Sequence, residues 1–255
     1  MNNATFVAVS CIHVPHHREE VLNWLVSRLE ELKPTHFILL GDLFEAGSVS
    51  VHPSEYWDSL EEEYEAGSNY LEVIRKALPE KTELVWTLGN HDDNIQCPDP
   101  RRTDWRTRSL IHWNKNQQCG HIFQQWKQIP YIKGAKGVYR LGPCRFYHGF
   151  DAGMNSDELE ALQIAMSLKD PGWGLYVRGH THRPTPGVVQ CKRTAKVLLP
   201  YWYANPGTLG PMKPGYMARK DSNLWGAGLV SGECTLSSPR RPSRKDWDAT
   251  VEHFE

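Results

Sequence analysis

Short apolar runs that end at glycine, serine or asparagine alternate along the chain with longer stretches of helical periodicity. The runs TFVAVS (5–10), THFILL (35–40) and ELVWTL (83–88) predict buried strands. Between the first two, residues 18–32 repeat apolar side chains at the spacing of one helical face. These apolar positions are Val21, Leu22, Leu25, Leu29 and Leu32. The alternation predicts a β-α-β unit and, with the later elements, an α/β layered fold.

The following segments continue this pattern. Residues 54–78 predict a second long helix, and Gly67 and Ser68 leave open whether it is one piece or two. GVYRLG (137–142) and CRFYHGF (144–150) predict a β-hairpin around a Gly-Pro turn. Residues 155–170 predict a helix, and GLYVRG (174–179) predicts a further strand that runs into a histidine pair. On that helix, the apolar side is expected to carry Leu159, Leu162, Ile164 and Met166.

The chain is expected to form one main domain over residues 1–236. Residues 95–131 form a polar, aromatic-rich insert within it. Residues 237–255 are rich in proline, serine and charge, which predicts a weakly ordered tail. A chain of 255 residues is long enough to bury a full core without disulfides or metal staples.

The amino-acid composition excludes some classes of function. A formal net charge of -1 with 23% charged residues argues against a generic polyanion binder, so any nucleic-acid contact must be local. Six cysteines without a CxxC pair are expected to be reduced thiols and to form no disulfide. The N-terminus lacks the pattern of a secretory leader, and no run of 18 apolar residues occurs. We expect a cytoplasmic protein that does not cross a membrane.

Metal-ligating residue types follow each of the predicted strands. CIH (11–13), GDLFE (41–45) and GNHD (89–92) end the first three strands, whereas His148 and GHTH (179–182) end later ones. Ligands in open α/β sheets bind beyond the carboxyl ends of the strands, so these segments are expected to meet there. The donors are His13, Asp42, Asn90, His148, His180 and His182, with Cys11 uncertain. They suffice for two ions of a phosphoester-hydrolysing pair.

In their order along the chain, the motifs GD, GNHD, lone His and GHTH resemble those of the calcineurin-like metallophosphoesterases. YANPGTLGP (203–211) is similar to a turn that many bacterial members carry after GHxH. The resemblance implies a four-layer sandwich of two mixed β-sheets flanked by α-helices. It also implies metal-dependent hydrolysis of phosphoester bonds, with two divalent ions (Mn, Zn or Fe) as cofactors.

The resemblance further implies a role for each motif residue. Asp42 would bridge the two ions, His13 and His182 would bind the first ion together with residue 11, and the second would be bound by Asn90, His148 and His180. His91 would face the substrate as a catalytic residue, and Asp92 would orient it by hydrogen bonding. Water held by the metals would be the nucleophile, since bound metal lowers its pKa.

Residue 11 departs from the family pattern, which begins Asp-x-His where this chain has Cys-Ile-His. Three interpretations stay open. In the first, Cys11 is a thiolate ligand, which favours zinc or iron over manganese or magnesium. In the second, Cys11 is a small buried apolar residue and the first ion is bound weakly. In the third, the first metal site is lost. Intact His13 and His182 favour ligation.

The sequence indicates the substrate less clearly than the metal ligands. The insert places Arg101, Arg102, Arg106 and Arg108 among Trp105 and Trp113, and Arg178 and Arg183 flank GHTH. These arginines are candidates for phosphate binding, and a solvated loop explains the insert equally well. We expect a phosphodiesterase acting on a nucleotide or nucleic acid. The alternatives are a phosphomonoesterase, protein phosphatases included, and a non-catalytic metal- or nucleic-acid-binding relative. Glu45 is expected either to support Asp42 or to start a helix, and His16 and His17 to lie at the start of the first helix.

Overall fold

The computed structural model describes residues 3–50, 58–96, 106, 108–111, 120, 123–170, 172–192, 200–212, 224–236 and 243–255. Two mixed sheets form its centre. The six-stranded sheet has the order β11 (Trp247–His253), β10 (Gly228–Thr235), β1 (Asn3–Val9), β2 (His36–Leu39), β3 (Glu83–Thr87) and β4 (Lys127–Ile129). The five-stranded sheet has the order β5 (Tyr139–Leu141), β6 (Cys144–Tyr147), β7 (Leu175–Arg178), β9 (Trp202–Ala204) and β8 (Val189–Gln190).

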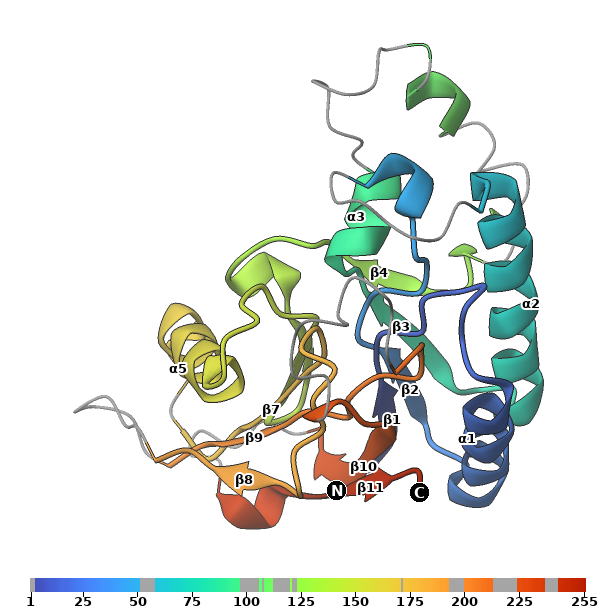
Figure 1. The fold of residues 1–255 in the computed structure, drawn as a ribbon. Coiled ribbons are helices and arrows are strands. Elements are labelled where there is room, and N and C mark those ends of the chain that lie inside the picture. The colour runs from blue at the N-terminus through green and yellow to red at the C-terminus, as the bar shows by residue number, and fades with distance from the viewer. Residues whose placement is uncertain are drawn as a thin grey trace.

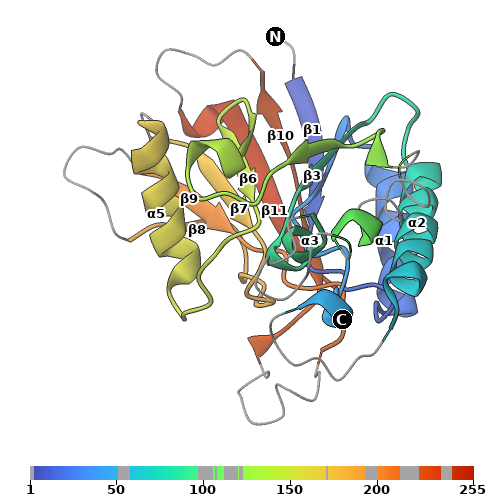
Figure 2. The same ribbon diagram turned by 90° about the horizontal axis from the view of Figure 1, so that it is seen from above.

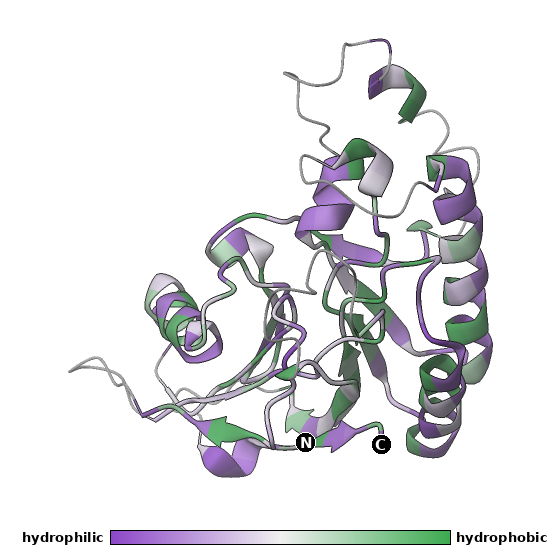
Figure 3. Cartoon of the chain, in the orientation of Figure 1, coloured by the Kyte–Doolittle hydropathy of each residue, from purple (hydrophilic) through white to green (hydrophobic). Residues whose placement is uncertain are grey.

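Helices cover the outer face of each sheet, which gives four layers (Figures 1 and 2). Helices α1 (Glu19–Leu32) and α2 (Leu60–Ala77) pack on the six-stranded sheet, and α5 (Ser156–Leu168) packs on the five-stranded one. Apolar side chains form core clusters between the sheets and beneath the helices. In Figure 3 much of the central strands is coloured as hydrophobic. The predicted four-layer α/β sandwich is thereby confirmed.

The strands that precede the candidate motifs pair with their neighbours in parallel. Strands β1, β2, β3 and β4 are mutually parallel, as are β6, β7 and β9. Their carboxyl ends therefore lie at one edge of each sheet. The short helix α3 (Asn90–Gln96) follows β3 directly at this edge. The predicted hairpin forms as the antiparallel pair of β5 and β6.

Helix α2 runs unbroken through Gly67 and Ser68, where two pieces were an open alternative. A capping box starts it, because the Ser59 hydroxyl accepts from the Glu62 amide and the Glu62 carboxylate accepts from the Ser59 amide. Gly67 lies against the ring of Phe44, and an added Cβ would approach the ring carbon Cε1 to 2.6 Å. The glycine thus lets α2 pack closely on the loop after β2.

Residues 243–255 do not form the weakly ordered tail that the composition predicts. Of these, residues 247–253 form β11, an edge strand paired antiparallel with β10 along its whole length. Trp247 and Ala249 point into the core between the sheets, while Asp248 and Thr250 are exposed. This alternation is a period-two strand signal that the charged and proline-rich composition around it obscured.

Helix α5 differs from its expected apolar face. Ala161, Ile164 and Ala165 are its buried apolar residues, whereas Met166 is 57% exposed. The carboxylate of Glu160 is buried on the same side and accepts hydrogen bonds from the amides of Phe150 and Asp151. The expected face is therefore confirmed for Ile164, and Leu162 packs against the same core, whereas Met166 lies outside it. Among the described helices, none combines the length and apolar character that a membrane span requires.

Candidate metal centre

Backbone conformation marks the turns that carry the candidate ligands. Cys11, His13, Asp42, His180 and His182 all have positive φ, at 56°, 54°, 52°, 69° and 59°. This left-handed region costs a non-glycine residue roughly 1–2 kcal/mol. Five such residues at the ends of β1, β2 and β7 show that the tight turns there are imposed by the surrounding packing, as is common at functional sites.

The first group of donors consists of Cys11, His13 and His182. One potential ligand atom from each lies within 4.8 Å of the other two, and all three residues are buried. The Nε2 atoms of His13 and His182 lie 3.3 Å apart although they come from different sheets. Two imidazole nitrogens that face each other at this distance suit a shared cation between them.

The second group surrounds Nε2 of His148. This atom lies 3.1 Å from Asp42 Oδ2, 3.1 Å from Asn90 Oδ1 and 3.2 Å from His180 Nδ1. On the other side of the ring, Nδ1 of His148 donates to the Leu40 carbonyl at 2.6 Å. That bond places the proton on Nδ1 and leaves the Nε2 lone pair facing the cluster. Several acceptor atoms therefore converge with too few protons between them, which fits a divalent ion.

Cys11 lies between the two groups. Its side chain is fully buried, and Sγ also lies within 4.8 Å of ligand atoms of Asp42 and His148. The amide of His180 donates to Sγ at 3.3 Å. The backbone carbonyl of Cys11 accepts from the Thr208 hydroxyl at 2.7 Å and from the Gly210 amide at 2.9 Å. Both donors follow the Asn-Pro-Gly sequence at 205–207.

Burial lowers the pKa of two of the candidate ligands, His180 and His182. Burial, assisted by His148, lowers the pKa of His180 to about 3, and burial with His13 nearby holds the pKa of His182 well below its usual range. Burial opposes ionisation of Asp42, yet the adjacent His148 and His91 hold its pKa well below the ordinary value. Burial and the Asp42 charge raise the pKa of the Cys11 thiol. A cation would be needed to make the thiolate.

Glu45 contacts two of the candidate histidines. Its carboxylate Oε2 accepts from Nδ1 of His13 at 2.9 Å, and its backbone carbonyl accepts from Nδ1 of His91 at 2.5 Å. The expected support of Asp42 is instead support of His13. Although burial opposes it, the charges of Asp42 and Glu45 raise the pKa of His91.

Asp92 occupies a place different from the one expected. Its carboxylate accepts from the backbone amides of Asp42, Leu43, Phe44 and Gly89 and from the indole of Trp86. The hydrogen bonds of His91 go to Asp42 Oδ1 and the Glu45 carbonyl. In the structure, Asp92 therefore holds the turn that carries Asp42 and does not orient His91, because its lone pairs are taken by that turn.

The structure places the arginines that are candidates for phosphate binding in different environments. Arg178 is fully buried, and its guanidinium lies 3.4 Å from Asp157 Oδ1 and 3.2 Å from Glu160 Oε2. This internal ion pair contradicts a phosphate-binding role. The guanidinium of Arg183 donates to the carbonyls of Ala152 and Gly153. Arg101 and Arg102 lie outside the described residues.

Other contacts had no clear sequence signal. The ring of Trp225 packs against that of His182, with centroids 4.2 Å apart. Asn205 donates to the Gly179 carbonyl at 3.2 Å and the Thr181 hydroxyl at 2.8 Å, which braces the GHTH turn. The similarity of residues 203–211 to a known turn was the available hint. His16 and His17 pair with Asp58 and Glu19, away from the two ligand groups.

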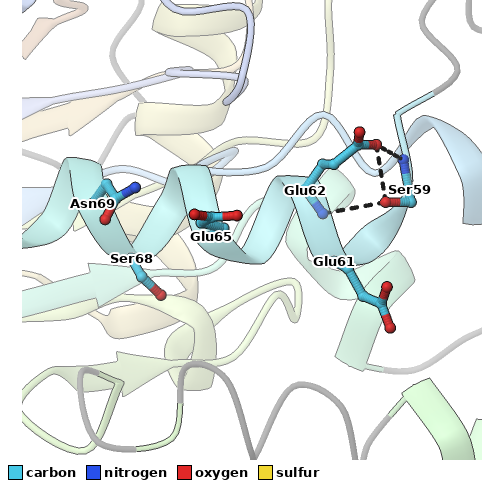
Figure 4. Close-up of a pocket in the computed structure, with 6 residues that line it drawn as sticks. All are labelled: Ser59, Glu61, Glu62, Glu65, Ser68 and Asn69. Carbon is cyan, nitrogen blue, oxygen red and sulfur yellow. Dashed lines mark hydrogen bonds between the residues drawn. The ribbon is translucent and has the colours of Figure 1, made fainter.

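A hollow of about 600 Å³ lies along α2, away from these ligands (Figure 4). Its lining includes Glu61, Glu62 and Glu65. Negative charge there would repel a phosphate, so we do not assign the substrate to this surface.

The chain is similar to proteins of one known family. The model of the calcineurin-like phosphoesterase family matches residues 4–184. Among solved structures, the chain is similar to a metallophosphoesterase from Sphaerobacter thermophilus, with 13% identity, a TM-score of 0.48 and coverage of 100% of this chain and 89% of the other. Vacuolar Protein Sorting 29 from Cryptosporidium parvum has 14% identity, a TM-score of 0.46 and full coverage of both chains. The phosphoesterase Yfce from E. coli has 16% identity, a TM-score of 0.39 and coverage of 91% and 93%. No curated protein sequence matches the chain. The family match extends over most of the chain and includes every candidate ligand, and the protein therefore belongs to the calcineurin-like phosphoesterase family.

Proposed function

We propose that this protein is a hydrolase of phosphoester bonds that uses two divalent metal ions. The convergence of two groups of buried donors carries the proposal. Cys11, His13 and His182 would hold the first ion, and Asn90, His148 and His180 the second, with Asp42 between them. When bound, the ions would polarise the phosphoryl oxygens and lower the pKa of a water.

The remaining residues of the site would position the substrate and move a proton. His91 donates Nδ1–H to the Glu45 carbonyl, which directs its Nε2 away from that carbonyl. When the ring is protonated, its Nε2–H can donate to the leaving oxygen. His91 would thus act as the general acid, and Asp92 would keep the Asp42 turn in place.

For the substrate class, we propose a phosphodiester of a nucleotide or nucleic acid. Support comes from the sequence pattern of the insert, where arginines alternate with tryptophans immediately after His91. Arginine binds phosphate oxygens in a bidentate manner, and indole rings stack on bases. Most of this insert lies outside the described residues.

The test is hydrolysis of bis-p-nitrophenyl phosphate, a diester, against p-nitrophenyl phosphate, a monoester, with Mn²⁺ or Zn²⁺ added. We expect faster turnover of the diester, and at least a hundredfold loss in His91→Asn. The matched control is His16→Gln, a histidine that pairs with Asp58 outside the ligand groups and should retain activity. No turnover of either ester by protein with bound metal would refute a hydrolase. Preference for the monoester would refute the diester assignment alone.

A further inference from the structure

The two ligand groups share one atom, Sγ of Cys11. This sulfur lies within 4.8 Å of the ligand atoms of His13 and His182 and, in the other group, of those of Asp42 and His148. Among the described residues, no other side chain belongs to both groups. It follows the end of β1, which pairs in parallel with β2, the strand that precedes Asp42.

One oxygen of the Asp42 carboxylate lies in the second group, where Oδ2 is 3.1 Å from His148 Nε2. Its Oδ1 accepts from the His91 amide at 3.0 Å and lies close to Gly89, where an added Cβ would meet Oδ1 at 2.1 Å. Asp42 therefore leaves room for a second side chain to be shared between the groups.

A thiolate has the properties that a shared ligand requires. Sulfur is large and carries several lone pairs, so it can bind two cations at about 2.3 Å each. The His180 amide donates to Sγ at 3.3 Å and would stabilise the anion, and the side chain is fully buried, which excludes competing water.

We propose that the thiolate of Cys11 bridges the two metal ions, as a ligand of both. This inference rests on the proposed dinuclear site. Sulfur then belongs to each ion's shell, which explains how the centre tolerates cysteine at a position where an aspartate would bind the first ion alone. Both sites would favour metals that accept soft donors, such as zinc or cobalt over magnesium.

Cobalt reports thiolate ligation directly, because a thiolate–Co²⁺ bond gives an ultraviolet charge-transfer band that imidazole and carboxylate do not. The experiment loads the protein with Co²⁺, measures the bound ions per chain and compares the band in variants that remove one site. His182→Ala removes a ligand of the first group and His180→Ala one of the second. Circular dichroism checks that each variant is folded.

A bridging sulfur predicts that both single-site variants bind one ion and keep about half of the band of the two-ion protein. Cys11→Asp should lose the band while still binding metal, whereas Cys191→Ser, a buried thiol remote from the site, should keep it in full. If one histidine variant kept the whole band and the other none, the sulfur would be a ligand of one ion and the bridge would be refuted. Absence of the band with two ions bound would also refute it. Fewer than two ions in the unmodified protein would overturn the dinuclear function itself.

Discussion

The carboxylate of Glu45 accepts a hydrogen bond from Nδ1 of His13 at 2.9 Å, and both side chains are buried. This contact places the His13 proton on Nδ1 and turns the Nε2 lone pair toward His182, which lies 3.3 Å away. A carboxylate behind a ligating histidine raises the basicity of the ring and fixes its orientation. Glu45 would thus orient His13 for the proposed metal binding.

Replacing Glu45 by glutamine should weaken metal binding at the first site by about 10–100-fold, because the charge behind His13 is lost. Competition with a chromogenic chelator measures the affinity. Glu61→Gln, on the exposed face of α2, is the control and should leave affinity unchanged. Equal affinities in both variants would exclude Glu45 from the metal centre.

Replacing Asp92 by asparagine should destabilise the protein by about 2–4 kcal/mol. Five N–H groups point at this carboxylate, and an amide offers one acceptor oxygen and an NH₂ group that conflicts with them. Urea unfolding measures the free energy. Asp93→Asn on the same helix should change it by less than about 0.5 kcal/mol. A fully stable Asp92→Asn with reduced activity would instead return Asp92 to a role beside His91.

Replacing Arg178 by methionine should cost about 3–5 kcal/mol of unfolding free energy, because it leaves the buried Glu160 and the partly buried Asp157 without their cation. Arg183→Met, whose guanidinium contacts exposed carbonyls, should cost far less. Urea unfolding and the KM for bis-p-nitrophenyl phosphate distinguish the roles. A raised KM at unchanged stability would restore Arg178 as a phosphate ligand.

Stability should fall as pH rises through the titration range of Glu63. Burial, despite the bond from the Ala46 amide, raises the pKa of this carboxyl from about 4.5 to about 8. Since the folded state holds the proton more tightly, the stabilisation is complete below about pH 4.5 and is lost toward pH 8. Glu63→Gln keeps the acceptor for Ala46 and should flatten this part of the profile. Denaturant unfolding at pH 5, 7 and 9 tests it, and parallel profiles of the two proteins would contradict the raised pKa.

Most secondary structure followed from patterns local to the chain. The face of α1 with Val21, Leu22, Leu25 and Leu29 is buried as its periodicity predicts. The apolar runs at 5–10, 35–40 and 83–88 form β1, β2 and β3. Local patterns failed where a residue serves a distant partner, as Gly67 does for Phe44 and Glu160 for the amides of residues 150 and 151.

For the candidate site, the sequence could name residues but not their neighbours. Motif order predicted which strand ends would carry donors, because parallel strands bring their carboxyl ends to one edge. Motif order could not predict that Arg178 faces inward to Asp157, because the residue type at a strand end does not determine whether the side chain points to solvent or to a helix. Nor could it tell that Asp92 would bind the turn at Asp42, because that contact depends on the register of β2 against β3.

The sequence by itself determined the layered α/β class, the family and the set of candidate metal ligands, because these depend on residue type, spacing and order. Only the tertiary structure decided that Glu45 stands behind His13, that Arg178 is internal and that the sulfur of Cys11 lies between both ligand groups. Those relationships join residues far apart along the chain. His13 and His182, for example, are separated by 169 positions, and only the packing of the two sheets against each other fixes such distances.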